Sequence, residues 1–230
     1  MYKNGIKRIF DFWGALLAFI VLFPFLFIFT ILGIIFMRGN PFFIQSRPGK
    51  DEKIFKLIKF RTMSNKKDQD GNFLPDERRL NSYGKFLRST SVDELPELIN
   101  ILKGDMSFIG PRPQLVKDMV FMTDEQRKRH TVRPGLSGLA QVNGRNAITW
   151  EDKLTLDLQY IERITFVGDM RLIFKTIGKV LKRADINREG TMSDLDFGDY
   201  LLEKGEVSVD EYEIKMGKAK KLLVSENGKV

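Results

Sequence analysis

The sequence predicts an α+β fold, in which an apolar N-terminal membrane element precedes a mostly helical domain with a small β element. Three observations lead to this prediction. No charged residue lies between Asp11 and Arg38, several later segments have apolar residues at helical spacing, and residues 53–61 alternate between cationic and apolar side chains as strands do. With 230 residues, the chain can form one domain with a sizeable core plus an appendage.

The apolar segment from Trp13 to Met37 has two interpretations. As one straight helix it would be about 37 Å long, enough to cross a hydrocarbon core of about 30 Å. Pro24 lies near its middle, however, and predicts a kink or break into halves of about 16–20 Å. Basic residues flank both ends, which favours a hairpin that enters and leaves by the same face. From the residues alone, crossing and hairpin stay equally open.

The composition of the rest of the chain is that of a soluble domain. Residues 42–44 fit a short strand or an interfacial aromatic anchor, residues 53–61 a strand with one basic face, and residues 65–77 a polar surface loop. Helices are predicted at residues 80–87, 92–102, 114–129, 150–163 and 170–183. The last of these is basic and amphipathic, which suits a membrane surface or packing on a soluble core. We expect domains at 1–38, 39–190 and 191–230, the last an acidic extension without an assigned role.

Composition limits the chemistry. The formal charge of +8 indicates an anionic partner, such as nucleic acid, a nucleotide or an anionic membrane surface. The absence of cysteine excludes disulfides, thiolate zinc sites and a thiol nucleophile, and the single histidine, His130, excludes a multi-histidine metal site. Acid and base chemistry must therefore come from carboxylates, lysines or a bound metal.

Two adjacent carboxylates, Asp93 and Glu94, lie at the predicted start of the helix at residues 92–102, where Ser89 or Ser91 could cap it. Neighbouring side chains on a helix point about 100° apart, so the two acids cannot form one symmetric pair. Acidic residues are common in the first helical turn because they interact favourably with the helix dipole. Taken alone, the pair is better explained by helix stability than by function.

The cations around this pair favour a functional interpretation. Arg112 lies between Pro111 and Pro113, so its backbone is conformationally restricted before any ligand binds. Other cations suited to phosphate lie in or beside turns and helix ends, namely Lys59, Arg61, Arg88, Arg133 and Arg145. Carboxylates, cations and glycine-rich loops without a catalytic histidine predict phosphoryl transfer with a divalent metal.

Short motifs occur in order after the apolar segment: Lys59–Met63, Arg88–Pro96, Gly104–Ser107, Gly110–Pro113, Arg133–Gly135 and Gln141–Arg145. Through these motifs, residues 1 to about 190 resemble the bacterial sugar transferase family, the monotopic phosphoglycosyl transferases that begin glycoconjugate assembly. The resemblance implies that a phosphosugar passes from a UDP-sugar to a polyprenyl (undecaprenyl) phosphate with release of UMP.

The resemblance also implies residue roles. Asp93 would be the covalent nucleophile and a ligand of Mg²⁺ at the diphosphate, and Glu94 would assist it. The substrate-binding residues would be Lys59, Arg61, Arg88, Arg112, Arg133, Gln141 and Arg145. The apolar segment would be a re-entrant hairpin broken at Pro24, in a bacterial inner membrane protein whose catalytic domain is cytosolic.

We therefore expect a UDP-sugar, a polyprenyl phosphate and the membrane as partners, no nucleic acid, and an oligomeric state left open, with a homo-oligomer included. The alternative from another class is a non-catalytic, membrane-tethered basic module that binds nucleic acid or anionic lipid. Release of UMP in the presence of Mg²⁺ separates the two, because a binding module releases none.

Overall fold

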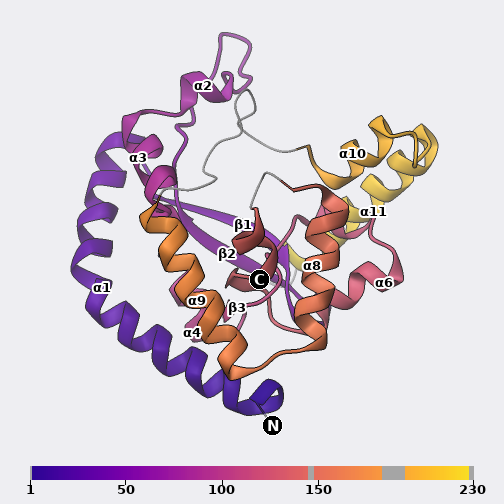
Figure 1. Ribbon diagram of the computed structural model, residues 1–230. Helices are drawn as coiled ribbons and strands as arrows, with labels where there is room; N and C mark the ends of the chain where they lie inside the picture. Colours follow the sequence, from indigo (N-terminus) through magenta and orange to yellow (C-terminus); the bar gives the residue numbers. More distant parts are fainter. Residues whose placement is uncertain (1, 145–147, 183–194, 228–230) are drawn as a thin grey trace.

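The N-terminal apolar segment forms one long helix. The computed structural model describes residues 2–144, 148–182 and 195–227. A short π-helical turn (η1, Tyr2–Ile6) leads into α1 (Lys7–Met37), which continues through Pro24 and curves around the rest of the molecule (Figure 1). The structure therefore has a curved continuous helix where the sequence predicts a kink or break. By length and composition α1 could cross a membrane, and only 6% of its most apolar stretch is buried.

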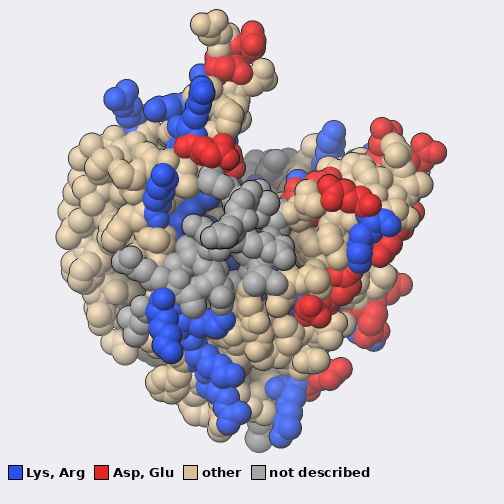
Figure 2. Space-filling view, turned by 45° about the horizontal axis from the view of Figure 1, so that its top comes forward, with Lys and Arg blue, Asp and Glu red and all other residues tan. Residues whose placement is uncertain are grey.

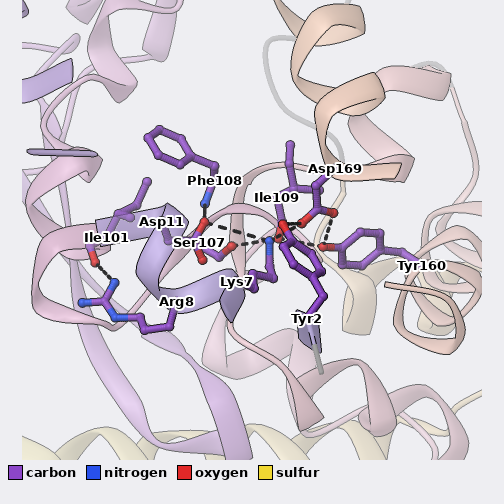
Figure 3. Close-up of polar contacts among 10 residues, drawn as sticks. All are labelled: Tyr2, Lys7, Arg8, Asp11, Ile101, Ser107, Phe108, Ile109, Tyr160 and Asp169. Atoms are coloured by element: carbon purple, nitrogen blue, oxygen red, sulfur yellow. Dashed lines mark hydrogen bonds and ion pairs between the residues drawn. The ribbon is translucent and has the colours of Figure 1, made fainter. Parts of the chain in front are cut away.

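Both halves of α1 pack against the same domain. Near its start, Arg8 donates a hydrogen bond of 2.5 Å to the carbonyl oxygen of Ile101 (Figure 3). Beyond Pro24, the hydroxyl of Tyr83 donates a hydrogen bond of 2.8 Å to the carbonyl oxygen of Phe29. Apolar side chains from both halves join the domain's core. This support on each side of the proline explains how one helix stays continuous while it curves.

The outer face of α1 is apolar. Its exposed side chains include Leu17, Ile20 and Phe27, and the side of the molecule where α1 lies in Figure 1 is almost free of charged atoms in Figure 2. Such a continuous exposed apolar face marks a surface that meets a membrane or another protein. The protein is thus built to associate with an apolar phase along this side.

A β-hairpin follows α1. Strand β1 (Phe42–Pro48) pairs antiparallel with β2 (Ile54–Phe60), and a 3₁₀ turn (η2, Lys50–Glu52) joins them. The strand predicted at residues 53–61 is confirmed, and residues 42–44 are part of a strand. The hairpin places Lys59, near the end of β2, beside the segment that contains the two carboxylates.

The segment after the hairpin differs from the single helix predicted at residues 92–102. The polar loop contains an isolated bridge and ends in α2 (Asp76–Arg79), after which come α3 (Ser82–Thr90), a 3₁₀ turn (η3, Val92–Glu94) and α4 (Glu97–Lys103). Ser91 ends α3 with a left-handed backbone, φ 56°, and precedes the next turn, η3, without a side-chain capping bond. The carboxylates consequently lie on a tight turn between two helices.

The helix predicted at residues 114–129 is wrong in part. The chain forms two short helices there, α5 (Val116–Met119) and α6 (Asp124–Arg127), followed by a 3₁₀ turn (η4, Lys128–Thr131). Met119 and the three residues after it are all buried. Four consecutive buried residues cannot share one face of an α-helix, so burial of this run breaks the helix.

Two short parallel strands lie at the centre of the molecule. Strand β3 (Ser107–Ile109) pairs with β4 (Gly135–Ser137), and α7 (Leu139–Asn143) follows. The two strands approach closely at Gly135, where a Cβ atom would lie 2.1 Å from the amide nitrogen of Gly110. Glycine at this position therefore permits the backbone contact that supports the loop after β3.

Two longer helices cover this centre (Figure 1). Helix α8 (Trp150–Glu162) matches the prediction, and α9 (Phe166–Leu181) starts four residues earlier than predicted because Thr165 caps it. Phe174 and Ile177 of α9 are exposed although they are apolar. Helix α9 therefore has an outward apolar side, as the interfacial interpretation expects.

The C-terminal helices share one hydrophobic core with α8 and with the buried residues that follow α5. Helices α10 (Phe197–Glu203) and α11 (Val209–Asn227) pack on Trp150 and Leu154 of α8. The indole N–H of Trp150 donates a 3.0 Å hydrogen bond to the carbonyl oxygen of Leu195. Figure 2 shows that acidic side chains gather on this side of the molecule. The extension thus braces α8 on the side opposite α1 in Figure 1.

Candidate active site

Four charged side chains from four different segments meet in one cluster. The Lys59 Nζ atom lies 3.0 Å from Glu94 Oε1 and 3.1 Å from Glu97 Oε1. Arg112, in the proline loop after β3, reaches the same Glu94 oxygen at 2.9 Å. The hairpin, η3, α4 and the proline loop each contribute one member. We refer to Lys59, Glu94, Glu97 and Arg112 as the charge cluster.

Burial and neighbouring charges shift the pKa values of Glu94 and Glu97 in opposite directions. Burial opposes ionisation of Glu94, but Lys59 and Arg112 outweigh it and hold the pKa of Glu94 well below its ordinary value. Burial dominates at Glu97 and raises its pKa to about 7, against the attraction of Lys59. Burial lowers the pKa of Lys59, yet Glu94 and Glu97 together raise it above its usual value. The cluster therefore holds Glu94 ionised between two cations.

Asp93 is in a different electrostatic position. Its carboxylate makes no hydrogen bond or ion pair with the residues that the structure describes. Burial and the neighbouring Glu94 raise its pKa to about 6, while Lys59, Arg112 and Arg88 oppose the increase. A partly desolvated carboxylate without a partner, surrounded by cations, is free to act as a nucleophile or to bind a cation.

The local backbone conformation makes the Asp93 and Glu94 side chains point in different directions. Residues 92–94 form the 3₁₀ turn η3, so Asp93 and Glu94 point in different directions, as the sequence predicts. The helix caps predicted at the serines do not form, because the Ser89 hydroxyl donates to the carbonyl oxygen of Phe86 and Ser91 ends α3. The turn is held instead by packing of Val92 and Leu95 on the core.

The other predicted site residues lie at various distances from the cluster. Arg88 acts on Asp93 electrostatically and donates to the Thr62 hydroxyl at 3.0 Å, whereas the Arg61 side chain has no carboxylate partner in the described chain. Arg133 donates to the carbonyl oxygen of Gly104, at the far end of α4, so the structure does not bring it into the cluster. Arg145 lies outside the described residues.

An apolar cavity of about 480 Å³ opens beside the charge cluster. Glu94 and Arg112 form part of its wall, and Gln141 lines it with a buried side-chain oxygen that has no partner in the described chain. The remaining wall is mainly apolar and comes from α1, η3, α4, β3, β4, α7 and α9, including Ala18, Leu22, Leu98, Phe108, Leu136, Ile173, Ile177 and Val180. The cavity can hold an apolar chain whose charged end faces the cluster.

Sequence analysis missed Glu97, which contributes the second carboxylate to Lys59. Its three-residue spacing from Glu94 was the available signal, because residues three apart share a helical face. It also missed Arg129, whose 1% exposed guanidinium pairs with Asp157 at 2.6 Å. No sequence pattern links these two residues, because their partnership depends on tertiary packing.

The single histidine takes no part in this chemistry. His130 is buried in η4, and burial together with Arg129 lowers its pKa to about 3. The side chain is therefore neutral at ordinary pH.

The sequence resemblance predicts a bound Mg²⁺ ion with Asp93 as a ligand, and the site residues can be compared with this prediction. In the described part of the chain, no group of three or more His, Cys, Asp or Glu side chains is arranged to hold a metal ion. Mg²⁺ is usually bound by one or two carboxylates together with phosphate and water oxygens. The carboxylate of Asp93, which has no partner within residues 2–144, 148–182 and 195–227, fits that arrangement as a single protein ligand. The residues are thus compatible with a magnesium ion that arrives with a phosphorylated substrate.

Together, the long exposed apolar helix, the apolar cavity and the charge cluster beside it are the features of a membrane-associated protein. The sequence model of the bacterial sugar transferase family matches residues 2–183. The chain belongs to this family.

Named relatives support the assignment. The uncharacterized sugar transferase EpsL of Bacillus subtilis is 45% identical over 76% of this chain and 87% of its own length. The UDP-galactose-lipid carrier transferase of Erwinia amylovora is 36% identical over 77% of this chain, which spans 41% of that protein. An N-acetylgalactosaminephosphotransferase of Aeromonas hydrophila that acts with undecaprenyl phosphate is 36% identical over 76% of this chain and 44% of its own length. The chain thus spans less than half of these last two relatives.

Proposed function

We propose that this protein transfers a phosphosugar from a UDP-sugar to a polyprenyl phosphate, with undecaprenyl phosphate the expected acceptor, and releases UMP. The observation on which the proposal chiefly rests is the Asp93 carboxylate, which has no partner among the described residues and lies next to a charge cluster whose Glu94 and Arg112 line an apolar cavity. The names of the Erwinia amylovora and Aeromonas hydrophila relatives support the same substrates.

The reaction has two displacement steps. An oxygen of Asp93 attacks the phosphorus that bears the sugar, the bond from that phosphorus to the UMP oxygen breaks, and UMP leaves. A phosphate oxygen of the polyprenyl phosphate then attacks the aspartyl phosphosugar and frees Asp93. Lys59, Arg88 and Arg112 lie close enough to Asp93 to influence its pKa, so they can offset negative charge that develops on the phosphoryl oxygens.

The residues also suit the expected magnesium ion. Asp93 would hold it together with the diphosphate, and the bound ion would neutralise phosphate charge. Glu94 is already paired with Lys59 and Arg112, so its role is to hold these cations in place beside Asp93. Among the remaining predicted ligands, Gln141 faces the cavity, and Arg61, Arg133 and Arg145 stay proposals without a structural placement at the cluster.

For the membrane segment, we propose a re-entrant arrangement of residues 1–38 with the catalytic domain, residues 39–190, on the cytoplasmic face. A straight helix of this length would carry its two ends to opposite sides of a membrane about 30 Å thick. Arg8 and Phe29, on opposite sides of Pro24, both bond to the same domain, which supports entry and exit by one face. Residues 191–230 form an extension outside the family match.

This topology can be tested with single cysteines, because the natural chain has none. We expect Lys3→Cys and Asn65→Cys, both at exposed positions, to react with a membrane-impermeant maleimide from the same side of oriented vesicles. Reaction of the two cysteines from opposite sides would show that α1 crosses the membrane.

The cavity is the proposed site for the first part of the prenyl chain. Its apolar wall includes Ala18 and Leu22 of α1, which ties the acceptor's entry to the membrane segment. The polar end, with Glu94 and Arg112, lies where the acceptor's phosphate must arrive. A long apolar tail could then continue along the outward faces of α1 and α9.

Narrowing the cavity should affect one substrate only. We expect Ala18→Phe to raise KM for polyprenyl phosphate about tenfold, because the larger side chain occupies space needed by the lipid, and to leave KM for the UDP-sugar within about twofold. The matched control is Leu17→Phe, since Leu17 is 65% exposed and does not line the cavity. Equal KM changes for both substrates in Ala18→Phe would argue against this placement of the lipid.

The reaction itself is tested by incubating the purified protein with Mg²⁺, a polyprenyl phosphate and a panel of UDP-sugars. We expect UMP release with at least one sugar and its loss without the lipid after the first turnover. Absence of UMP with every sugar, together with oligonucleotide binding that weakens steeply with salt, would favour the non-catalytic basic module.

A further inference from the structure

The loop that presents Arg112 is held by its backbone. Four of its carbonyl oxygens, those of Ile109, Pro111, Arg112 and Pro113, accept hydrogen bonds from groups outside the loop. The donors are the Tyr160 hydroxyl to Ile109 at 3.0 Å, the Gly135 amide to Pro111 at 2.9 Å, the Arg129 guanidinium to Arg112 at 2.6 Å and the Arg47 guanidinium to Pro113 at 3.1 Å. The Arg112 side chain itself is 43% exposed. Its position therefore depends on these backbone contacts more than on packing.

One helix provides two of these supports. Asp157 and Tyr160 are three residues apart on α8, so they lie on the same helical face. Tyr160 binds the loop directly, and Asp157 acts through Arg129, which it contacts at 2.6 Å and 2.9 Å. Asp157 is 2% and Arg129 is 1% exposed, so water cannot readily replace these bonds.

The Tyr160 hydroxyl has a second acceptor. It lies 2.9 Å from Asp169 Oδ1 at the start of α9, and a hydroxyl has one proton to share between this carboxylate and the Ile109 carbonyl. Lys7 at 2.5 Å and the Tyr2 hydroxyl at 2.8 Å occupy the other oxygen of Asp169 (Figure 3). Lys7 offsets the negative charge of Asp169, with or without the Tyr2 hydroxyl, and this leaves the Tyr160 proton available to the loop.

We propose that Tyr160 and the Arg129–Asp157 pair are positioning residues that fix Arg112 against Glu94, so that the ion pair between Lys7, at the start of α1, and Asp169 is linked to the active site. This inference rests on the proposed function. The hydrogen bonds run from Lys7 and Tyr2 through Asp169 and Tyr160 to Ile109, three residues before Arg112. The contacts that hold the start of α1 against the domain and those that position Arg112 thus belong to one hydrogen-bonded network.

If loss of the Tyr160 contact displaces Arg112, the effect should appear mainly in kcat. Arg112 stabilises charge that develops during phosphoryl transfer, and small displacements of such a group reduce the rate of the chemical step. UDP-sugar affinity also depends on other cations, including Lys59 and Arg88, which Tyr160 does not contact. A purely structural role for Tyr160 would instead lower the amount of folded protein without changing kcat per folded molecule.

The test compares Tyr160→Phe with Tyr2→Phe. Both remove a hydroxyl that binds Asp169, but only Tyr160→Phe removes a bond to the loop. We expect Tyr160→Phe to lower kcat about tenfold with KM for the UDP-sugar within about twofold, and Tyr2→Phe to keep both constants within about twofold. Hydrogen exchange of the peptide containing residues 107–115 should speed up in Tyr160→Phe and not in Tyr2→Phe.

The hydrogen-exchange measurement tests the Tyr160 contact with the loop independently of the proposed function. If the wild-type protein releases no UMP, the proposed function fails, while faster exchange in Tyr160→Phe alone still supports the loop contact. Equal exchange and equal kcat in the two variants would overturn the positioning role of Tyr160. A fall in kcat that follows only the loss of folded protein would overturn it as well.

Discussion

Asp93→Asn is expected to reduce UMP release by about 10⁴-fold or more and to abolish the covalent phosphosugar adduct. Asparagine keeps the size of the side chain but is not a competent nucleophile, and loss of a nucleophile costs rates of this order in enzymes with covalent intermediates. Mass spectrometry of the intact protein after incubation with UDP-sugar and Mg²⁺ measures the adduct, and a coupled assay measures UMP.

The fold should survive this substitution. The Asp93 carboxylate makes no hydrogen bond or ion pair with the described residues, and burial already raises its pKa to about 6. Removing the charge therefore leaves no partner unpaired, and we expect the melting temperature to stay the same or rise. An Asp93→Asn protein that still forms the adduct at the wild-type rate would show that another residue is the nucleophile.

Lys59→Met is expected to remove both activity and stability. Lys59 is the cation that Glu94 and Glu97 share, and its side chain is only 18% exposed. Removing one partner of a buried ion pair costs about 3–5 kcal/mol, and the lower value fits here because Glu97, with a pKa of about 7, can take up a proton. A loss of about 3 kcal/mol corresponds to a melting temperature about 6–12 °C lower in a protein of this size.

A double variant separates stability from catalysis. Adding Glu97→Gln to Lys59→Met removes the second carboxylate, while Glu94 keeps its 2.9 Å contact with Arg112. We expect the double variant to recover at least half of the lost melting temperature and to stay inactive, because the cation needed near Asp93 is still missing. Calorimetry and the UMP assay measure the two effects. Recovery of activity along with stability would limit Lys59 to a structural role.

Local sequence patterns predicted the longer elements well. The alternating strand near Lys59 and the helix at residues 150–163 depend on side-chain periodicity that tertiary contacts reinforce. The helix predicted at residues 114–129 was wrong in part because Val120, Phe121 and Met122 are all buried, and that requirement comes from the C-terminal helices that pack on them. Helical periodicity cannot anticipate burial by a segment eighty residues away.

In the candidate site, too, some features follow from local sequence and others only from tertiary contacts. Residue types and spacing identified Asp93, Glu94, Lys59 and Arg112, and the structure places Lys59 at 3.0 Å and Arg112 at 2.9 Å from the same oxygen of Glu94. Arg133 is 39 residues from Glu94 in sequence, comparable to the 35 residues that separate Lys59 from Glu94, yet its guanidinium bonds to the carbonyl oxygen of Gly104 at the other end of α4. Glycine and proline patterns locate a loop, but they do not determine which of its side chains reach a shared site.

By itself, the sequence determined the apolar N-terminal segment, the α+β class, the pair of neighbouring acids and the absence of thiol and multi-histidine chemistry, because these depend on composition and short-range spacing. Tertiary structure alone decided that α1 continues through Pro24, that Glu97 shares Lys59 with Glu94, and that Tyr160 holds the loop of Arg112. Each of these features needs residues distant in sequence to meet at atomic distances, and only the folded chain sets such distances.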